Sequence, residues 1–110
     1  MTMYERLDGL VKQFNERSEK DEELRNEIAH LKKTFLLDLG TEVYTIKLED
    51  SKITEFKEEK TETPDVTVIS TPEHLNALID GELRPMRAYV TGKVKIKGKI
   101  QDLKFLKKFL

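Results

Sequence analysis

A chain of 110 residues, 37 % of them charged and 37 % hydrophobic, is long enough for one domain with one core, and we expect a single domain over residues 1–110. The absence of cysteine excludes a disulfide framework and a cysteine nucleophile. The formal net charge of −1 conceals a strong asymmetry, because residues 34–82 carry a net charge of −8 and residues 83–110 a net charge of +8. The last quarter of the chain therefore favours anionic partners.

The ends of the chain bear on its location. Glu5 and Asp8 lie where a secretory signal would need an apolar run. No apolar run approaches the roughly 20 residues of a membrane span. The final residues, Lys108-Phe109-Leu110, do not form a peroxisomal signal of the Ser-Lys-Leu type. We expect a cytoplasmic protein.

The first third of the chain reads as helical. Residues 2–5 have the form of a capping box, and apolar residues at helical spacing then predict a helix over residues 4–14. The polar stretch 15–21 is expected to break or bend the chain. A second helix is expected over residues 21–33, with one long helix as the alternative.

Alternating apolar and polar residues predict four strands, over residues 34–39, 43–48, 53–57 and 65–70. Short turns join the first three strands, which favours an antiparallel meander. In the third strand Ile53 and Phe56 fall on opposite faces, which indicates a bulge or an edge position.

The second half begins with two helices and ends with a strand and a helix. Thr71 and Pro72 mark the start of one helix, which Gly81 ends, and Pro85 opens a shorter helix that ends at Gly92. Residues 93–97 alternate between apolar and basic side chains, as in a strand with one buried face. A closing helix is expected over residues 102–110.

These elements carry a recognisable pattern. Asp65-Val66-Thr67-Val68, followed by Leu78-x-x-Gly81-x-Leu83-x-Pro85-Met86-x-Ala88-Tyr89-Val90-x-Gly92-Lys93-Val94-Lys95-Ile96-Lys97-Gly98, resembles the sterol-carrier-protein-two (SCP-2-like) domain family. The order of elements fits along the whole chain. The resemblance implies an α+β fold, in which helices cover a five-stranded, mostly antiparallel sheet. It also implies an apolar tunnel between sheet and helices that binds fatty acids, fatty acyl-coenzyme A or sterols.

By this resemblance, the tunnel wall comes from the two helices of residues 72–91, the sheet floor and the closing helix: Leu75, Leu78, Ile79, Leu83, Met86, Tyr89, Val90, Ile96, Phe105, Leu106 and Phe109. A tyrosine in such a wall buries its ring beside an acyl chain and offers its hydroxyl to a carboxylate. From the residues alone, an ordinary filled core is the alternative. The lack of tryptophan and of a peroxisomal signal argues against sterol as the ligand and against a peroxisomal role.

The basic strand suggests a second kind of contact. Its lysines, and the one that follows, would attract an anionic membrane or the phosphates of an acyl-coenzyme A: Lys93, Lys95, Lys97 and Lys99. The alternative is that these lysines keep an exposed edge strand from pairing with another chain. Nucleic acid is not expected as a partner, because the lysines lack interleaved aromatic residues for base stacking.

Catalytic motifs are missing from the sequence. It has no Gly-x-Ser-x-Gly elbow, no phosphate-binding glycine loop and no metal-ligand spacing, and His30 and His74 are expected at the surface. We therefore expect no enzymatic activity and no cofactor or metal. Two hypotheses remain: a lipid carrier for fatty acid or acyl-coenzyme A, and a protein-interaction module with a filled core and a basic docking face.

Overall fold

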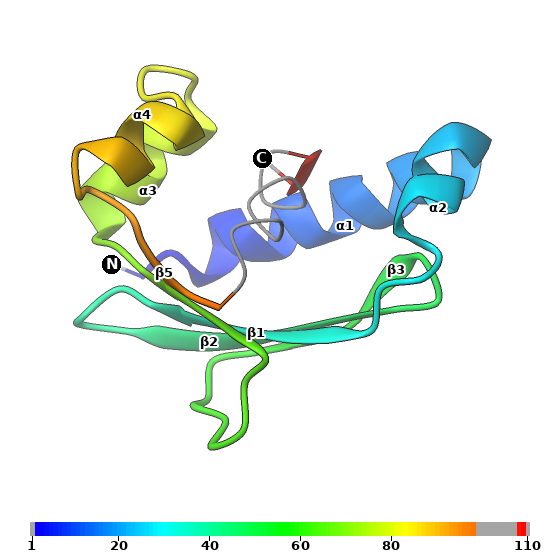
Figure 1. Ribbon diagram of the computed structural model, residues 1–110, viewed down its shortest axis with the longest axis horizontal. Coiled ribbons are helices and arrows are strands. Elements are labelled where there is room, and N and C mark those ends of the chain that lie inside the picture. Colours follow the sequence, from blue (N-terminus) through cyan, green and yellow to red (C-terminus); the bar gives the residue numbers. More distant parts are fainter. Residues whose placement is uncertain (1, 99–107, 110) are drawn as a thin grey trace.

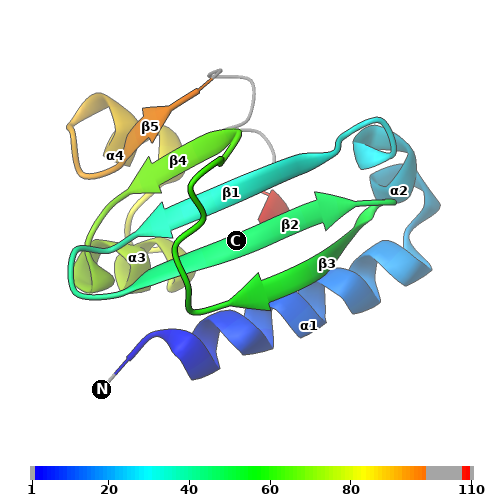
Figure 2. The same cartoon turned by 90° about the horizontal axis from the view of Figure 1, so that it is seen from below.

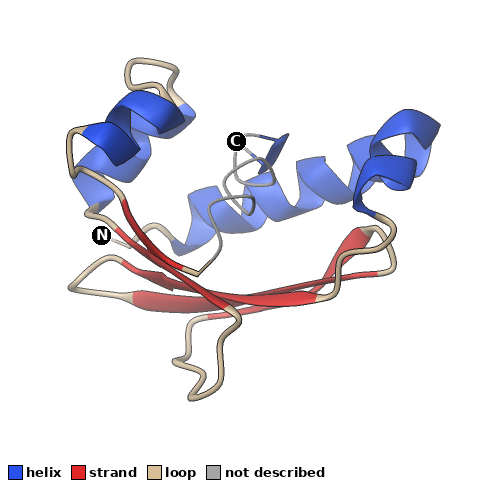
Figure 3. Cartoon of the chain, in the orientation of Figure 1, coloured by secondary structure: helices blue, strands red, loops and turns tan. Residues whose placement is uncertain are grey.

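The computed structural model describes residues 2–98 and 108–109. Within this part of the chain, one sheet lies beneath a layer of helices that all cover the same face (Figures 1 and 3). The helices are α1 (Tyr4–Lys20), α2 (Glu22–Ile28), α3 (Pro72–Ile79) and α4 (Pro85–Val90). The strands are β1 (Lys33–Asp38), β2 (Val43–Glu49), β3 (Lys52–Lys57), β4 (Val66–Ile69) and β5 (Lys95–Lys97).

The sheet has the strand order β3-β2-β1-β4-β5. β1, β2 and β3 form the predicted antiparallel meander, and β5 pairs antiparallel with β4. Among the described strands, β1 and β4 form the one hydrogen-bonded pair that is parallel. The chain reaches β4 by crossing the outer face of the meander in residues 58–65 (Figure 2). The predicted α+β class and mostly antiparallel sheet are confirmed.

The predicted irregularity in the third strand is also confirmed. The register between β2 and β3 shifts between Lys47 and Leu48, and β3 is an edge strand. Ile53 then lies opposite Leu48, and Phe56 lies opposite Ile46. The bulge therefore turns both apolar residues of β3 toward the helices, although strict alternation would separate them.

The core lies between the sheet and the helices. Tyr44 and Leu48 of β2 have no exposed surface, and Phe35 of β1 is 2 % exposed. They belong to one apolar cluster with Leu7 and Phe14 of α1. Helix α1 lies close along β3, so this end of the sheet is tightly covered.

The expected break between two helices is present, but it falls only at Asp21, the last residue of the polar stretch, because α1 continues to Lys20. Its polar residues stay helical because they have tertiary partners: Asn15 bonds to Ile53, and Ser18 donates its hydroxyl hydrogen to the carbonyl of Ser51. The capping box is wrong. Met3 is the N-cap, without a side-chain cap, and its amide donates to Glu42 at 2.6 Å.

The second helix is shorter than predicted and ends at Ile28, because β1 already begins at Lys33. Asp21 caps its start by accepting a hydrogen bond from the Leu24 amide at 3.1 Å.

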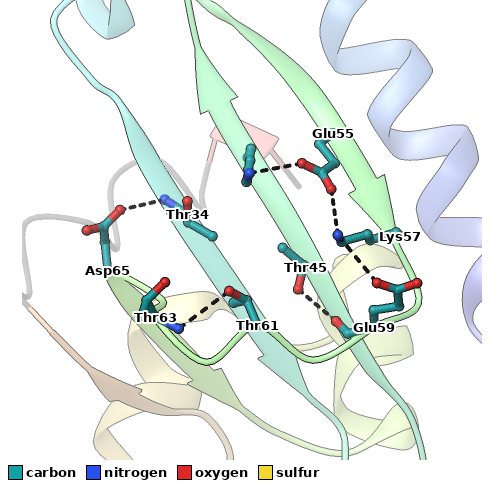
Figure 4. A network of polar contacts seen from close by, with 9 residues as sticks. Thr34, Thr45, Glu55, Lys57, Glu59, Thr61, Thr63 and Asp65 are labelled. Atoms are coloured by element: carbon teal, nitrogen blue, oxygen red, sulfur yellow. Dashed lines mark hydrogen bonds and ion pairs between the residues drawn. The ribbon is translucent and has the colours of Figure 1, made fainter.

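The outer face of the sheet is partly buried. Thr45 has no exposed surface, and Leu36 is 6 % exposed. The crossing segment 58–65 accounts for Thr45, whose hydroxyl donates to the carbonyl of Glu59 at 2.7 Å (Figure 4). An ion-pair chain from Lys47 through Glu55 and Lys57 to Glu59 extends along the same face.

Candidate functional site

The helix pair α3–α4 is fixed by local signals that the sequence displays. The Thr71 side chain caps α3 by accepting from the His74 amide at 3.1 Å, and Pro72 occupies its first turn. Gly92 ends α4 with a φ of +79°, which lets the Lys93 amide return to the Ala88 carbonyl at 2.8 Å. The Ser70 hydroxyl at the end of β4 then donates to the carbonyl of Lys93 at 2.9 Å. The pair is thus fastened to the sheet at both ends.

One long-range contact ties α3 to α1. The guanidinium of Arg6 donates to the side-chain amide oxygen (Oδ1) of Asn76 at 2.6 Å and forms an ion pair with Asp80. The partners are separated in the chain by the whole meander and β4, so no local pattern in the sequence announces them. Arg6 therefore helps to set where α3 sits, and sequence reasoning missed it.

Apolar side chains fill the space between α3–α4 and the sheet. Leu75 and Leu78 are 5 % and 8 % exposed, and Ala88 has no exposed surface. Three half-buried residues, Ile79, Leu83 and Ile96, pack against the same apolar cluster, which also includes Val68 of β4. Among the described elements, α3 and α4 make few close backbone approaches to any strand, in contrast to α1 beside β3. Side chains alone therefore bridge this layer.

Met86 and Val90 do not point into this layer, which corrects the expectation that they face its interior. Met86 is 44 % exposed and Val90 is 77 % exposed. The reason is the helical period: Ala88 takes the inward position, so residues two places before and after it face outward. Tyr89 is half-buried between these environments.

The basic strand is shorter than predicted. β5 covers Lys95–Lys97, and Val94 before it is 5 % exposed. Lys95 lies opposite Ile69, and Lys97 opposite Thr67. Both lysines are exposed on the outer face of the sheet, while their neighbour Ile96 faces the core. Lys93 is exposed before the strand, and Lys99 lies outside the described residues.

The predicted closing segment is described only at residues 108–109. Phe109 is 7 % exposed and meets the ring of Phe14 edge-on, with 6.0 Å between centroids. The carbonyl of Lys108 accepts from Arg17, and its ammonium pairs with Glu27. These two residues are thus anchored on α1 and α2. Phe105 and Leu106, and most of the predicted helix 102–110, lie outside the described residues.

A small polar cavity of about 240 Å³ lies beside this anchor, lined by Arg17, Asp21, Glu23, Leu24, Glu27 and Lys108. Its lining is charged, and Arg17 and Lys108 already have partners. This chemistry differs from the apolar wall that an acyl chain needs, so we separate the cavity from the layer beneath α3–α4.

The titratable groups of the described residues show little that points to catalysis. His30 is exposed, whereas His74, expected at the surface, is half-buried with an Nδ1 atom that lacks a hydrogen-bond partner. No group of metal-ligating side chains gathers within residues 2–98 and 108–109. Burial, together with a hydrogen bond to Glu42, raises the pKa of the Tyr44 phenol above its ordinary value.

Three solved structures illustrate the fold. The UbiJ-SCP2 ubiquinone synthesis protein is 17 % identical, with a TM-score of 0.69 over 92 % of this chain and 86 % of that one. The palmitated SCP2L2 of Aedes aegypti is 20 % identical, with a TM-score of 0.63 over 90 % of this chain and 87 % of that one. The sec-alkylsulfatase Pisa1 of a Pseudomonas species is 19 % identical, with a TM-score of 0.65 over 78 % of this chain. This chain spans only 14 % of the length of that alkylsulfatase.

Comparison with curated proteins gave no match. No helix in the described part of the chain is long and apolar enough to span a membrane. The model of the SCP-2 sterol transfer family matches residues 11–110, which is most of the chain. Together with the mixed five-stranded sheet under its helices, this match shows that the chain belongs to the SCP-2 sterol transfer family.

Proposed function

We propose that this protein is a non-catalytic lipid-binding domain that holds one fatty acyl chain between its sheet and the helix pair α3–α4. Membership of a sterol transfer family supports lipid binding in general. One observation carries the location: among the described elements, α3 and α4 make few close backbone approaches to the strands, and apolar side chains fill the layer between them. Such side chains rearrange around an apolar guest more readily than a close backbone contact does.

The proposed wall consists of the residues of this layer that belong to the core or pack against it, with half-buried Tyr89 at its edge and Phe109 at the end anchored on α1: Leu75, Leu78, Ile79, Leu83 and Ile96. Met86 and Val90 are left out because they are exposed. The wall carries no charged side chain, which suits a hydrocarbon chain. Tyr89 supplies a phenol for a carboxylate or ester group at the edge of the layer.

We propose a fatty acid or fatty acyl-coenzyme A as the cargo, ahead of a sterol. An unbranched acyl chain can follow a thin layer of leucine and isoleucine side chains, whereas a rigid ring system needs a preformed space. The structurally similar Aedes aegypti protein is described in its palmitated form, which supports an acyl chain on this fold.

The test measures palmitate and palmitoyl-coenzyme A binding by native mass spectrometry and by displacement of a fluorescent fatty acid. The wild type should bind one ligand per chain. Ile79→Asp places a carboxylate in the proposed wall and should weaken palmitate binding at least about tenfold, because a charge in an apolar site is costly. Ile69→Asp is the matched control, since Ile69 lies on the outer face of the same sheet beside Lys95, and it should bind as the wild type does.

Melting curves show whether each variant is folded, and Ile79→Ala, which keeps the site apolar, should weaken binding only a few-fold. A wild type that takes up neither ligand would contradict the proposal and favour the interaction module with a filled core. Equal loss in the Ile69 and Ile79 variants would contradict the assigned wall.

A further inference from the structure

Two of the large apolar side chains that the described structure leaves exposed lie on α4. Met86 is 44 % exposed and Val90 is 77 % exposed, whereas Ala88 between them has no exposed surface. Positions four apart share one face of a helix, and the position midway between them lies about 180° around it. The burial of Ala88 therefore turns both larger residues outward, and α4 itself lies at the periphery of the fold (Figure 1).

The charges that accompany this pair along the chain are basic. Residues 83–98 contain no acidic residue. Arg84, Arg87 and Lys93 are exposed, and the ion pairs found within the described residues do not involve them. The two acidic residues that most closely precede α4 in the chain are Asp80, which is paired with Arg6, and Glu82, which is exposed. Two protruding apolar side chains on the outer face of α4 are thus accompanied by three exposed cations, one on the helix (Arg87), one at its start (Arg84) and one just after its end (Lys93).

We infer that this surface, Arg84, Met86, Arg87, Val90 and Lys93, docks on an anionic lipid bilayer. A specific protein interface buries about 800 Å² on each partner, more than two side chains of a short helix offer. A bilayer needs no matching shape: apolar side chains enter the headgroup boundary while cations meet anionic lipid headgroups. This membrane contact would serve the proposed carrier function, but it can be measured on protein that holds no lipid.

This assignment moves the membrane contact away from the β5 lysines. Lys95 and Lys97 lie on the outer face of the sheet beside Ile69 and Thr67, opposite the face that the helices cover. In the described part of the chain, the large apolar side chains that are exposed are Tyr4, Met86 and Val90. None of these three residues belongs to β5 or to its neighbour β4. The contribution of Lys95 and Lys97 to docking is therefore long-range attraction at most.

The experiment is co-sedimentation of cargo-free protein with vesicles of phosphatidylcholine alone or mixed with phosphatidylserine. The wild type should bind the mixed vesicles, and added salt should weaken this binding. The double variant Met86→Asp/Val90→Asp should lower the partition coefficient at least about tenfold. Arg84→Ala and Arg87→Ala should each lower it about fivefold, as expected for one cation near an anionic surface. Lys95→Ala/Lys97→Ala is the matched control and should lower it less than either single arginine variant.

Three outcomes would overturn the inference. They are a wild type that does not bind mixed vesicles, a double variant that binds as well as the wild type, and a larger loss from the β5 lysine variant than from the α4 variants. The first would assign the surface to an acidic protein partner instead. Melting curves establish that the exposed substitutions leave the fold intact. Ile79→Asp separates the two proposals, since it should weaken palmitate binding at least about tenfold and leave vesicle binding unchanged.

Discussion

Asn15 of α1 pairs with the backbone of Ile53 in β3 through both ends of its side-chain amide. Its Nδ2 donates to the carbonyl of Ile53 at 3.0 Å, and its Oδ1 accepts from the amide of Ile53 at 2.8 Å. β3 is an edge strand, and its bulge lies near this point. The Asn15 side chain thus makes the backbone hydrogen bonds of Ile53 that a further strand at this edge would otherwise make.

Removing this pair should destabilise the fold. Asn15→Ala leaves an amide and a carbonyl of a partly buried edge without partners, which costs about 1–3 kcal/mol in the free energy of unfolding. Asn26→Ala, at an exposed position of α2, is the matched control and should change it by less than about 0.5 kcal/mol. Urea unfolding at neutral pH measures both variants. Equal midpoints would show that water replaces Asn15 at the edge.

Tyr44 should make the protein sensitive to alkali. Burial of the phenol and its hydrogen bond to Glu42 raise its pKa, so the folded state holds this proton more tightly than the unfolded state. The resulting stabilisation is complete below about pH 10, the ordinary pKa of tyrosine, and is lost as the pH rises further. Wild-type stability should therefore fall more steeply above pH 10 than that of Tyr44→Phe. Parallel curves from chemical unfolding at a series of pH values would contradict the assignment.

Two glycines should respond oppositely to alanine. Gly98 has a φ of +141°, and a Cβ atom there would lie 3.3 Å from the carbonyl oxygen of Asp65. Gly98→Ala should therefore destabilise the protein by about 1–3 kcal/mol. Gly9 lies in α1 with open space where a Cβ atom would be, so Gly9→Ala should stabilise it by about 0.5–1 kcal/mol. Thermal unfolding compares them, and a shift in the same direction for both would refute this interpretation of the backbone.

Phe109 should matter for stability although it is the penultimate residue of the sequence. It is 7 % exposed and contacts the ring of Phe14. Phe109→Ala should cost about 3–5 kcal/mol, whereas Phe109→Leu, which keeps most of the volume, should cost less than about 1.5 kcal/mol. Denaturant midpoints distinguish the two. Little loss from the alanine variant would mean that Phe109 is not anchored in the core.

Much of the fold was predictable because its signals are local. The alternation in β1 and β2, the proline that opens each of α3 and α4, and the conflict between Ile53 and Phe56 all appear within a few residues. The parallel pairing of β1 with β4 was not predictable from such patterns, because it depends on a crossing segment that packs on the outer face. The continuation of α1 was missed for the same reason, since Asn15 and Ser18 are held by distant backbone.

The candidate site was predicted less completely than the fold. Leu75, Leu78 and Ile79 lie inward as their spacing indicates. Met86 and Val90 were misplaced because a six-residue helix gives too short a pattern to choose between two faces, and the small residue Ala88 takes the inward one. An alanine between two larger apolar residues is the signal that would have warned of this.

The strand order has a consequence for how the protein is made. On the ribosome, residues 33–57 can complete the β1–β2–β3 meander from near neighbours in the chain, and β4 can then add to the free side of β1. β5 joins only when residues 95–97 emerge, and with it the connection from α4 through Lys93 to Ser70. The helix pair that covers the proposed lipid layer is therefore fastened only after β1 to β4 have been synthesised. Nascent chains should keep this layer open until residues 95–97 have left the ribosome.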